Sequence, residues 1–337
     1  MAHESLLQRL KGKLLVGIAL GGLLYLLLVV YSGWSDLSDA LSSFSWRLFP
    51  LLLALAFANY VFRFLKWDFY LRTLAIPLPK KDSFIIFLSG LIMTISPGKI
   101  GELLKTVLLK QANRTPIATS APIIIAERLT DFVALVVISL AGLITFTVDE
   151  SSIAVLAAVV IVLGAFIGLI GSRRVSLWLI GLLEKISFLS KIGHKLREAY
   201  ESTYRLVRFF PLLVATIWSV AAWFCECLGF WITLTAFTAH PNLLAAAFIY
   251  ALGTIVGVVS PGGLGVTEGS MVGMLQSGAL MGAAQLAKAP AAAATLIIRV
   301  ATLWFAVLVG AVVLLLFQNR FGDAADALEK ELSKEND

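Results

Sequence analysis

The chain has 337 residues, of which 59% are hydrophobic and 14% are charged, and its mean hydropathy is +0.91. This composition excludes an ordinary water-soluble domain and indicates a polytopic membrane protein. The net charge of +6 does not point to nucleic acid, because the basic residues gather in a few connecting loops, as the positive-inside rule describes.

Six apolar segments are long enough to cross a bilayer, which takes about 20 residues. In chain order they are 14–31, 46–71, 117–147, 153–170, 211–237 and 290–317. Basic residues before the first segment and a poor cleavage site after it predict an uncleaved helix with a cytoplasmic N-terminus. Loop charges likewise predict a cytoplasmic C-terminus, with 318–337 as a solvated acidic tail.

Two further apolar segments contain helix-breaking motifs. The string Ser96-Pro97-Gly98-Lys99-Ile100-Gly101-Glu102 lies within 84–109, and Ser260-Pro261-Gly262-Gly263-Leu264-Gly265 lies within 243–286. Proline and closely spaced glycines disfavour a continuous helix. Irregular backbone at membrane depth occurs only where protein or a water-filled cavity satisfies it. Flexible kinks in ordinary crossing helices are the alternative interpretation.

The basic loop 172–210 decides between these interpretations of the first break. If 84–109 crossed the bilayer once, the eight basic residues of that loop would lie outside. We therefore expect a re-entrant hairpin that enters and leaves on the cytoplasmic side. Within the loop, apolar residues recur at helical spacing, which predicts amphipathic helices on the inner leaflet.

The two breaks are 164 residues apart, and each lies in a unit of helix, broken hairpin and helix. The units span about 46–147 and 211–317 and run in opposite directions, which predicts an inverted-topology repeat with a central site. The predicted fold is therefore all-α, one membrane domain over 1–317 with six full transmembrane helices and two re-entrant hairpins. An additional crossing hidden in 243–288 is the alternative.

Ionisable residues inside apolar segments are costly and usually face a partner or a functional site. Arginine follows each break in an apolar helix, and guanidinium groups together with helix N-termini suit a phosphate. The predicted substrate-binding residues are Ser96, Gly98, Lys99, Gly101, Arg128, Ser260, Gly262, Gly263 and Arg299. The carboxylates predicted to pair or to carry a coupling proton are Glu102, Glu127, Asp131, Glu226 and Glu268.

Structural interpretations stand beside these roles. Glu127 or Asp131 can belong to a buried ion pair that fixes helix register, and Arg63 and Lys66 can snorkel toward the cytoplasm. The two cysteines, Cys225 and Cys227, are one residue apart and suit packing, and the three histidines lack metal-ligand spacing. We expect no metal, no cofactor and no catalytic residue.

Three strings resemble a known family: 96–102, Glu127-Arg128-Leu129-Thr130-Asp131, and 260–268. They are similar to the membrane, flippase-like domain of lysylphosphatidylglycerol synthases and its stand-alone relatives, the UPF0104 group. The resemblance covers about residues 10–320. It implies a multi-pass protein of a bacterial-type inner membrane that moves lipids between leaflets, aminoacylated phosphatidylglycerol in the fused members and other lipids in relatives. The aminoacyl-transferase domain of fused members does not follow here, so synthase activity is not expected.

The leading hypothesis is therefore a flippase for a phosphate-bearing lipid, aminoacylated or polyprenyl-linked, with membrane lipids as partners. One alternative is a membrane-embedded transferase for a lipid-linked substrate, in which Glu102 and Glu268 act as acid and base, although no Asp-x-Asp motif is present. A second alternative is an accessory subunit of a lipid-modifying complex. Small residues over 278–294 permit the close helix packing of a homodimer.

Overall fold

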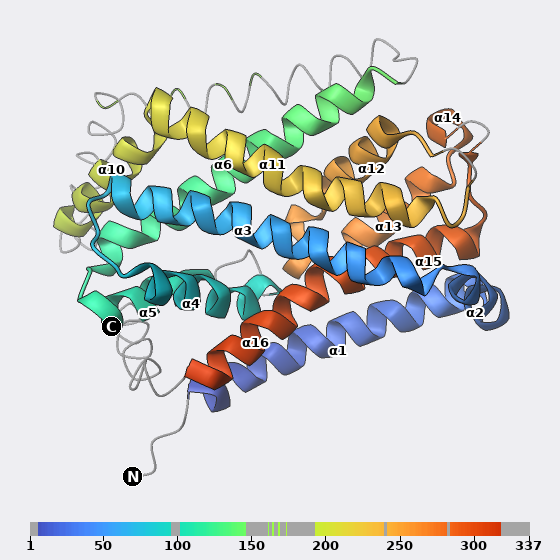
Figure 1. Cartoon of the computed structure of the whole chain (residues 1–337), viewed down its shortest axis with the longest axis horizontal. Coiled ribbons are helices and arrows are strands. Elements are labelled where there is room, and N and C mark those ends of the chain that lie inside the picture. The colour runs from blue at the N-terminus through green and yellow to red at the C-terminus, as the bar shows by residue number, and fades with distance from the viewer. Residues whose placement is uncertain are drawn as a thin grey trace.

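The computed structural model describes residues 6–95, 102–145, 193–238, 241–281 and 284–317, with isolated positions at 161, 164, 168 and 173. All regular structure in this part of the chain is helical (Figure 1). The predictions for 96–101, for most of 153–170, for 174–192 and for the tail at 318–337 lie outside it. The all-α fold class is confirmed for the described residues.

Three helical stretches are long and apolar enough to cross a membrane. They are η1 (Trp46–Leu48) with α3 (Phe49–Thr73), α11 (Phe209–Leu234), and α15 (Lys288–Arg299) continued by η7 (Val300–Trp304) and α16 (Phe305–Phe317). A fourth candidate is the bent pair α1 (Leu6–Ser32) and α2 (Trp34–Ser43), in which the two helices meet at 100°. The three long stretches begin and end close to predicted segments, so several apolar helices of membrane-spanning length are confirmed.

The helix α6 (Ile117–Leu143) coincides with another predicted span but contains Glu127, Arg128 and Asp131. It packs against α11, α12 (Leu243–Val256) and α10 (Gly193–Val207). Protein on these sides allows α6 to carry ionisable groups, which lipid would disfavour. The helix α10 belongs to the predicted amphipathic loop, and it buries Leu206 while exposing Arg205.

Both breaks interrupt the helices as predicted. In the first, α4 (Lys80–Gly90) continues into the 3₁₀ segment η2 (Leu91–Ile95), and α5 (Leu104–Asn113) follows residues 96–101. In the second, α12 is followed by η4 (Gly257–Val259), η5 (Pro261–Gly263) and α13 (Val266–Leu275), and the short α14 (Gly278–Met281) comes next. Glycines 262, 263 and 265 have φ of +61°, +77° and +83°, a backbone region that side chains with a Cβ rarely enter.

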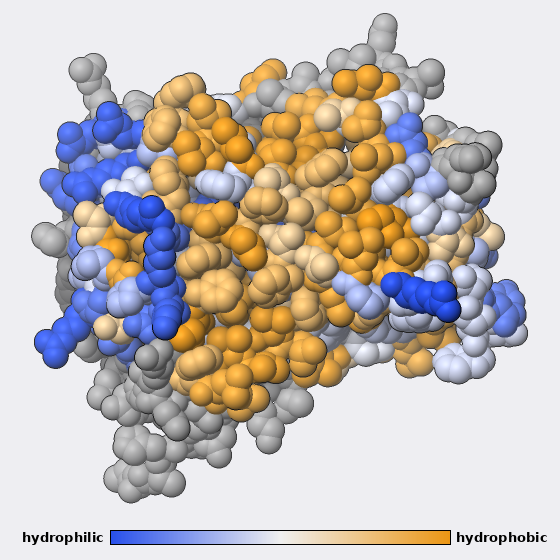
Figure 2. All heavy atoms as spheres, in the orientation of Figure 1, coloured by the Kyte–Doolittle hydropathy of each residue, from blue (hydrophilic) through white to orange (hydrophobic). Residues whose placement is uncertain are grey.

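The two broken segments enter the bundle from different ends. In Figure 1, α4 and α5 lie together at the end where α10 is found, whereas α12 and α13 run inward from the end near α2. The breaks meet in the interior, because η2 contacts η5 and Gly262 lies against Ile95. Figure 2 shows apolar side chains across the middle of this face and hydrophilic ones toward its two ends. The breaks therefore lie at the depth of the apolar band.

Close packing of η2 against α16 depends on Gly310. A Cβ at Gly310 would overlap the backbone nitrogen of Ile92, which cannot move without shifting the break. Gly273 on α13 offers a contrast, because a Cβ there would meet nothing within 4 Å. Replacing each glycine by alanine therefore distinguishes the effect of a steric clash, at Gly310, from the effect of helix propensity alone, at Gly273.

We expect Gly310→Ala to lower the free energy of unfolding by about 1–3 kcal/mol, because overpacking forces backbone to move. Gly273→Ala should be neutral or raise it by up to about 1 kcal/mol through better helix propensity. Thermal unfolding in one detergent measures both. Equal stability of the two variants would contradict the packing of η2 on α16.

Candidate functional site

A cluster of ionisable side chains occupies the interior beside the first break. Its members come from α3, from α6, from α5 and from the short segment before α5. They are Arg63, Lys66, Glu102, Lys105, Glu127, Arg128 and Asp131. We call these seven residues the charged cluster.

Asp131 is the centre of the charged cluster. Lys66 Nζ donates to Asp131 Oδ1 at 2.6 Å and to Ser219 Oγ of α11 at 2.7 Å, and the Ser219 hydroxyl itself donates to Asp131 at 3.0 Å. Arg63 and Arg128 lie 3.6 and 3.4 Å from Asp131 Oδ2. The Lys66 side chain is fully buried, so it does not snorkel, and that alternative interpretation is wrong. These contacts join α3, α6 and α11 through one group of side chains in the interior of the bundle.

Lys105 forms a second buried pair. Its Nζ lies 2.5 Å from Glu127 Oε2, and 4.8 Å from the ring centroid of Trp67. The electron-rich face of the ring and the carboxylate together stabilise the ammonium group. Gly90 makes room for the lysine stem, because a Cβ at Gly90 would overlap it.

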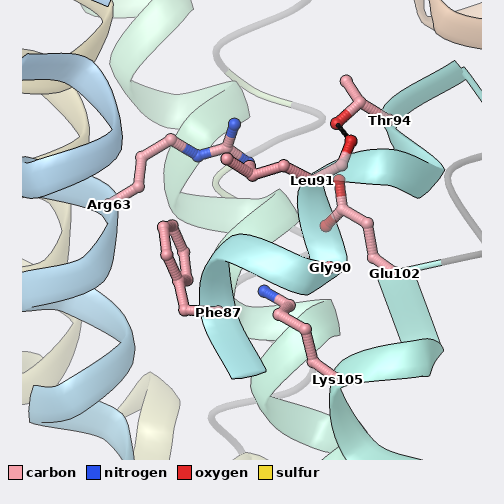
Figure 3. Close-up of a pocket in the computed structure, with 7 residues that line it drawn as sticks. All are labelled: Arg63, Phe87, Gly90, Leu91, Thr94, Glu102 and Lys105. Carbon is pink, nitrogen blue, oxygen red and sulfur yellow. Dashed lines mark hydrogen bonds between the residues drawn. The ribbon is translucent and has the colours of Figure 1, made fainter. Parts of the chain in front are cut away.

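A small cavity opens between α3 and the first break (Figure 3). It has a volume of about 10 Å³, which is room for a single water molecule. Its lining comprises Arg63, Phe87, Gly90, Leu91, Thr94, Glu102 and Lys105. Arg63 reaches in from α3, and Glu102 faces it from the segment before α5, where it pairs with Arg128 at 2.9 Å. The cavity thus presents both a guanidinium and a carboxylate.

The second break is held by Arg299, the last residue of α15. Its Nε donates to Glu268 Oε1 at 2.6 Å, and its Nη2 donates to the Gly262 carbonyl at 2.7 Å. The amide of Gly265 donates to Glu268 Oε2 at 2.7 Å. A carboxylate after each break therefore pairs with an arginine on the following long helix, Glu102 with Arg128 and Glu268 with Arg299.

Glu226 of α11 lies in a set of hydroxyl groups from α3, α12 and η7. Tyr250 donates to Glu226 Oε2 at 2.6 Å and lies 3.5 Å from Thr302 Oγ1. Tyr60 of α3 donates to the Thr302 carbonyl at 3.0 Å. Thr302 belongs to the π-helical η7 that directly follows Arg299, so this set lies next to the second break.

The structure brings most predicted site residues together in two places. Glu102, Glu127, Arg128 and Asp131 belong to the charged cluster. Gly262, Gly263, Glu268 and Arg299 form the second break, where Ser260 Oγ donates to the Gly257 carbonyl. Ser96, Gly98, Lys99 and Gly101 lie outside the described residues.

Sequence reasoning left three cluster members out of the site: Arg63, Lys66 and Lys105. Their signal was available, since Arg63 and Lys66 are three residues apart on one apolar helix and share a face. Within the described ranges, no group of three His, Cys, Asp or Glu residues could hold a metal ion.

The resemblance of the sequence motifs extends to the whole membrane region. Residues 14–310 match the family described as the lysylphosphatidylglycerol synthase TM region. The chain belongs to this family. Two relatives from Methanothermobacter thermautotrophicus, both named UPF0104 membrane protein, are 26% and 25% identical. The alignments cover 87% of this chain and 92% of the first relative, and 76% of this chain and 81% of the second.

In this member of the lysylphosphatidylglycerol synthase TM family, Lys66 and Asp131 should contribute to stability as a pair. We expect Lys66→Met to lower the free energy of unfolding by about 3 kcal/mol, because Asp131 would lose its closest cation inside the bundle. Adding Asp131→Asn should recover part of the loss, since the uncompensated charge disappears.

Chemical unfolding in detergent of the two single variants and the double variant gives the coupling energy. Lys81→Met serves as the control, because Lys81 is exposed at the start of α4 and its loss should change stability by less than about 0.5 kcal/mol. Additive effects of Lys66→Met and Asp131→Asn would contradict the pairing.

Proposed function

We propose that the protein moves a lipid with a phosphate-bearing headgroup between the leaflets of a cell membrane, of the bacterial inner-membrane type. The observation that carries this proposal is the cavity beside the first break, which Arg63, Glu102 and Lys105 of the buried charged cluster line (Figure 3). Broken helices that meet at this depth are typical of transport sites.

The pairing within the cluster favours an anion beside Arg63. Lys66, Lys105 and Arg128 each lie within 3 Å of a carboxylate, whereas Arg63 comes no closer than 3.6 Å to one. An anionic ligand would give this guanidinium a close partner away from water. Phosphate is a good bidentate partner for guanidinium.

Arg63 is the best-placed residue to bind this headgroup. It lines the cavity, its ion pair with Asp131 is the longest in the cluster at 3.6 Å, and none of the described residues accepts a hydrogen bond from it. Arg128, with a side chain 24% exposed, is the second candidate. Arg299 already donates to Glu268 and Gly262, so we assign it the role of holding the second break.

We further propose that the two halves are an inverted repeat that gives alternating access. The matching pairs Glu102–Arg128 and Glu268–Arg299 support this, as do the positions of α4 with α5 and of α12 with α13 toward different ends of the bundle (Figure 1). The cavity admits about one water, so a headgroup would enter only after one half moves.

Opposite entry of the hairpins can be tested by side-specific labelling. In a variant without Cys225 and Cys227, Lys81→Cys at the start of α4 and Gln285→Cys before α15 should react with a membrane-impermeant maleimide from opposite sides. Asp39→Cys in α2 should label from the same side as Gln285→Cys. Labelling of positions 81 and 285 from one side would contradict the inverted repeat.

The headgroup site can be tested with a matched pair of arginines on α3. We expect Arg63→Gln to reduce transport of fluorescent phosphatidylglycerol in proteoliposomes at least tenfold, because a charged hydrogen bond contributes about 1.5–3 kcal/mol. Arg72→Gln removes the same charge from a side chain that is 66% exposed and should stay within twofold of the unmodified protein.

Dithionite quenching of the labelled lipid in the outer leaflet measures the rate. Equal rates for Arg63→Gln and Arg72→Gln would contradict the site. No transport by the unmodified protein of phosphatidylglycerol, an aminoacylated lipid or a polyprenyl phosphate would contradict the proposed function itself.

A further inference from the structure

The N-terminal helix α1 lies along the outer edge of the bundle, outside both halves of the repeat (Figure 1). Much of the described surface of α1 faces outward, including Val16, Leu23 and Val30, which are 61%, 54% and 75% exposed. It contacts η2 of the first break, and it also contacts α15. The part of α1 that faces inward therefore covers the place where the breaks meet.

Part of the inward face of α1 packs on the first break and on the segment after α15. A Cβ at Gly17 would overlap Ile95, the last residue of η2, and a Cβ at Gly21 would overlap Trp304 in η7. Leu24 packs against an apolar group contributed by both breaks and by the helix that follows the second. We call this group the covered strip; its members are Ile95, Leu264, Leu303 and Val307.

The middle of α1 and its C-terminal end differ in the interactions that attach them to the bundle. Near the covered strip, one hydrogen bond from Trp304 Nε1 to the Tyr25 hydroxyl accompanies the apolar packing. Toward the C-terminal end of α1, the Tyr31 hydroxyl and Gln276 Oε1 are 3.3 Å apart, and Lys288 Nζ lies 5.4 Å from the centroid of the Tyr31 ring. The end at Tyr31 can thus act as a hinge while the middle of α1 moves.

Apolar contacts between helices in a bilayer are easily exchanged, because lipid chains are as apolar as leucine and no hydrophobic force drives the helices together. A hydrocarbon chain can therefore replace Leu24 on the covered strip at small cost. A transported lipid needs such a place, since its headgroup enters the protein while its chains stay in the apolar layer.

We propose that α1 is a lateral gate, and that the covered strip binds the hydrocarbon chain of the transported lipid when α1 moves aside. This inference rests on the proposed function and adds where the chain of the lipid lies. The strip adjoins both breaks, so a chain bound there would place the attached headgroup beside the central cavity.

Cross-linking tests the gate. In the variant without native cysteines, Leu24→Cys with Leu264→Cys is joined by a short bifunctional thiosulfonate that reductant removes. We expect lipid transport to fall at least tenfold on cross-linking and to return on reduction. The matched control joins Tyr31→Cys to Gln276→Cys at the hinge and should keep transport within twofold.

Unchanged transport after the first cross-link would overturn the gate. Loss of transport from both cross-links would overturn it as well, because α1 would then have to leave at both ends rather than swing at Tyr31.

A second measurement does not depend on transport. The reaction of Leu264→Cys with a lipid-soluble maleimide reports whether α1 covers the strip. Gly21→Leu should accelerate it at least fivefold by pushing against Trp304, whereas Gly22→Leu should not, because a Cβ at Gly22 meets nothing within 4 Å. Gly21→Ala and Gly22→Ala repeat the comparison if the larger side chains prevent folding.

Equal labelling rates for the position 21 and position 22 variants would contradict the claim that α1 covers the strip. Faster labelling in a protein that transports no lipid would instead contradict the proposed function and leave α1 as a movable cover of the strip.

Discussion

The ion pair between Lys66 and Asp131 is the interaction on which the site depends. It lies inside the bundle, where an isolated charge would be very costly, and Ser219 satisfies both partners from α11. Through it, the long helices α3, α6 and α11 are fixed at one depth. The other oxygen of the same carboxylate lies 3.6 Å from Arg63 and 3.4 Å from Arg128, and Arg63 also lines the cavity. Asp131 thus joins the structural pair with Lys66 to the two arginines of the proposed headgroup site.

The broken backbone is the second constraint, and each half meets it with a carboxylate and an arginine. At the second break, Arg299 and Glu268 bind a free carbonyl and a free amide of the glycine-rich turn, so irregular backbone is satisfied without water. At the first break, Glu102 and Arg128 pair beside a cavity. The two breaks therefore differ in how many of the guanidinium donors are already bound within the protein. The first half is the better candidate for the headgroup, and the second is the better candidate for a rigid support.

Local chemistry made the breaks and the long helices predictable. Proline and glycine at 260–265 determine the turn wherever it is placed, and apolar length marks α3, α11 and α15 with α16. The partners of the charges were not predictable in the same way. The sequence of α3 alone predicts that Lys66 snorkels toward the cytoplasm. Only its contacts with Asp131 and Ser219 on other helices show that it is buried. Burial depends on which helices pack together, and this information is spread over residues far apart in the chain.

The polar interior and the apolar edge place opposite demands on one protein. The charged cluster requires protein on every side, because lipid cannot satisfy it. The lipid substrate that we propose, however, requires a side that lipid chains can enter. The fold suits both demands, because apolar side chains close the breaks at this edge, Leu24 against Ile95 and Leu264, while the ion pairs lie among other helices. Opening this layer would break apolar contacts and the one hydrogen bond between Trp304 and Tyr25, so the edge can move without separating a buried ion pair.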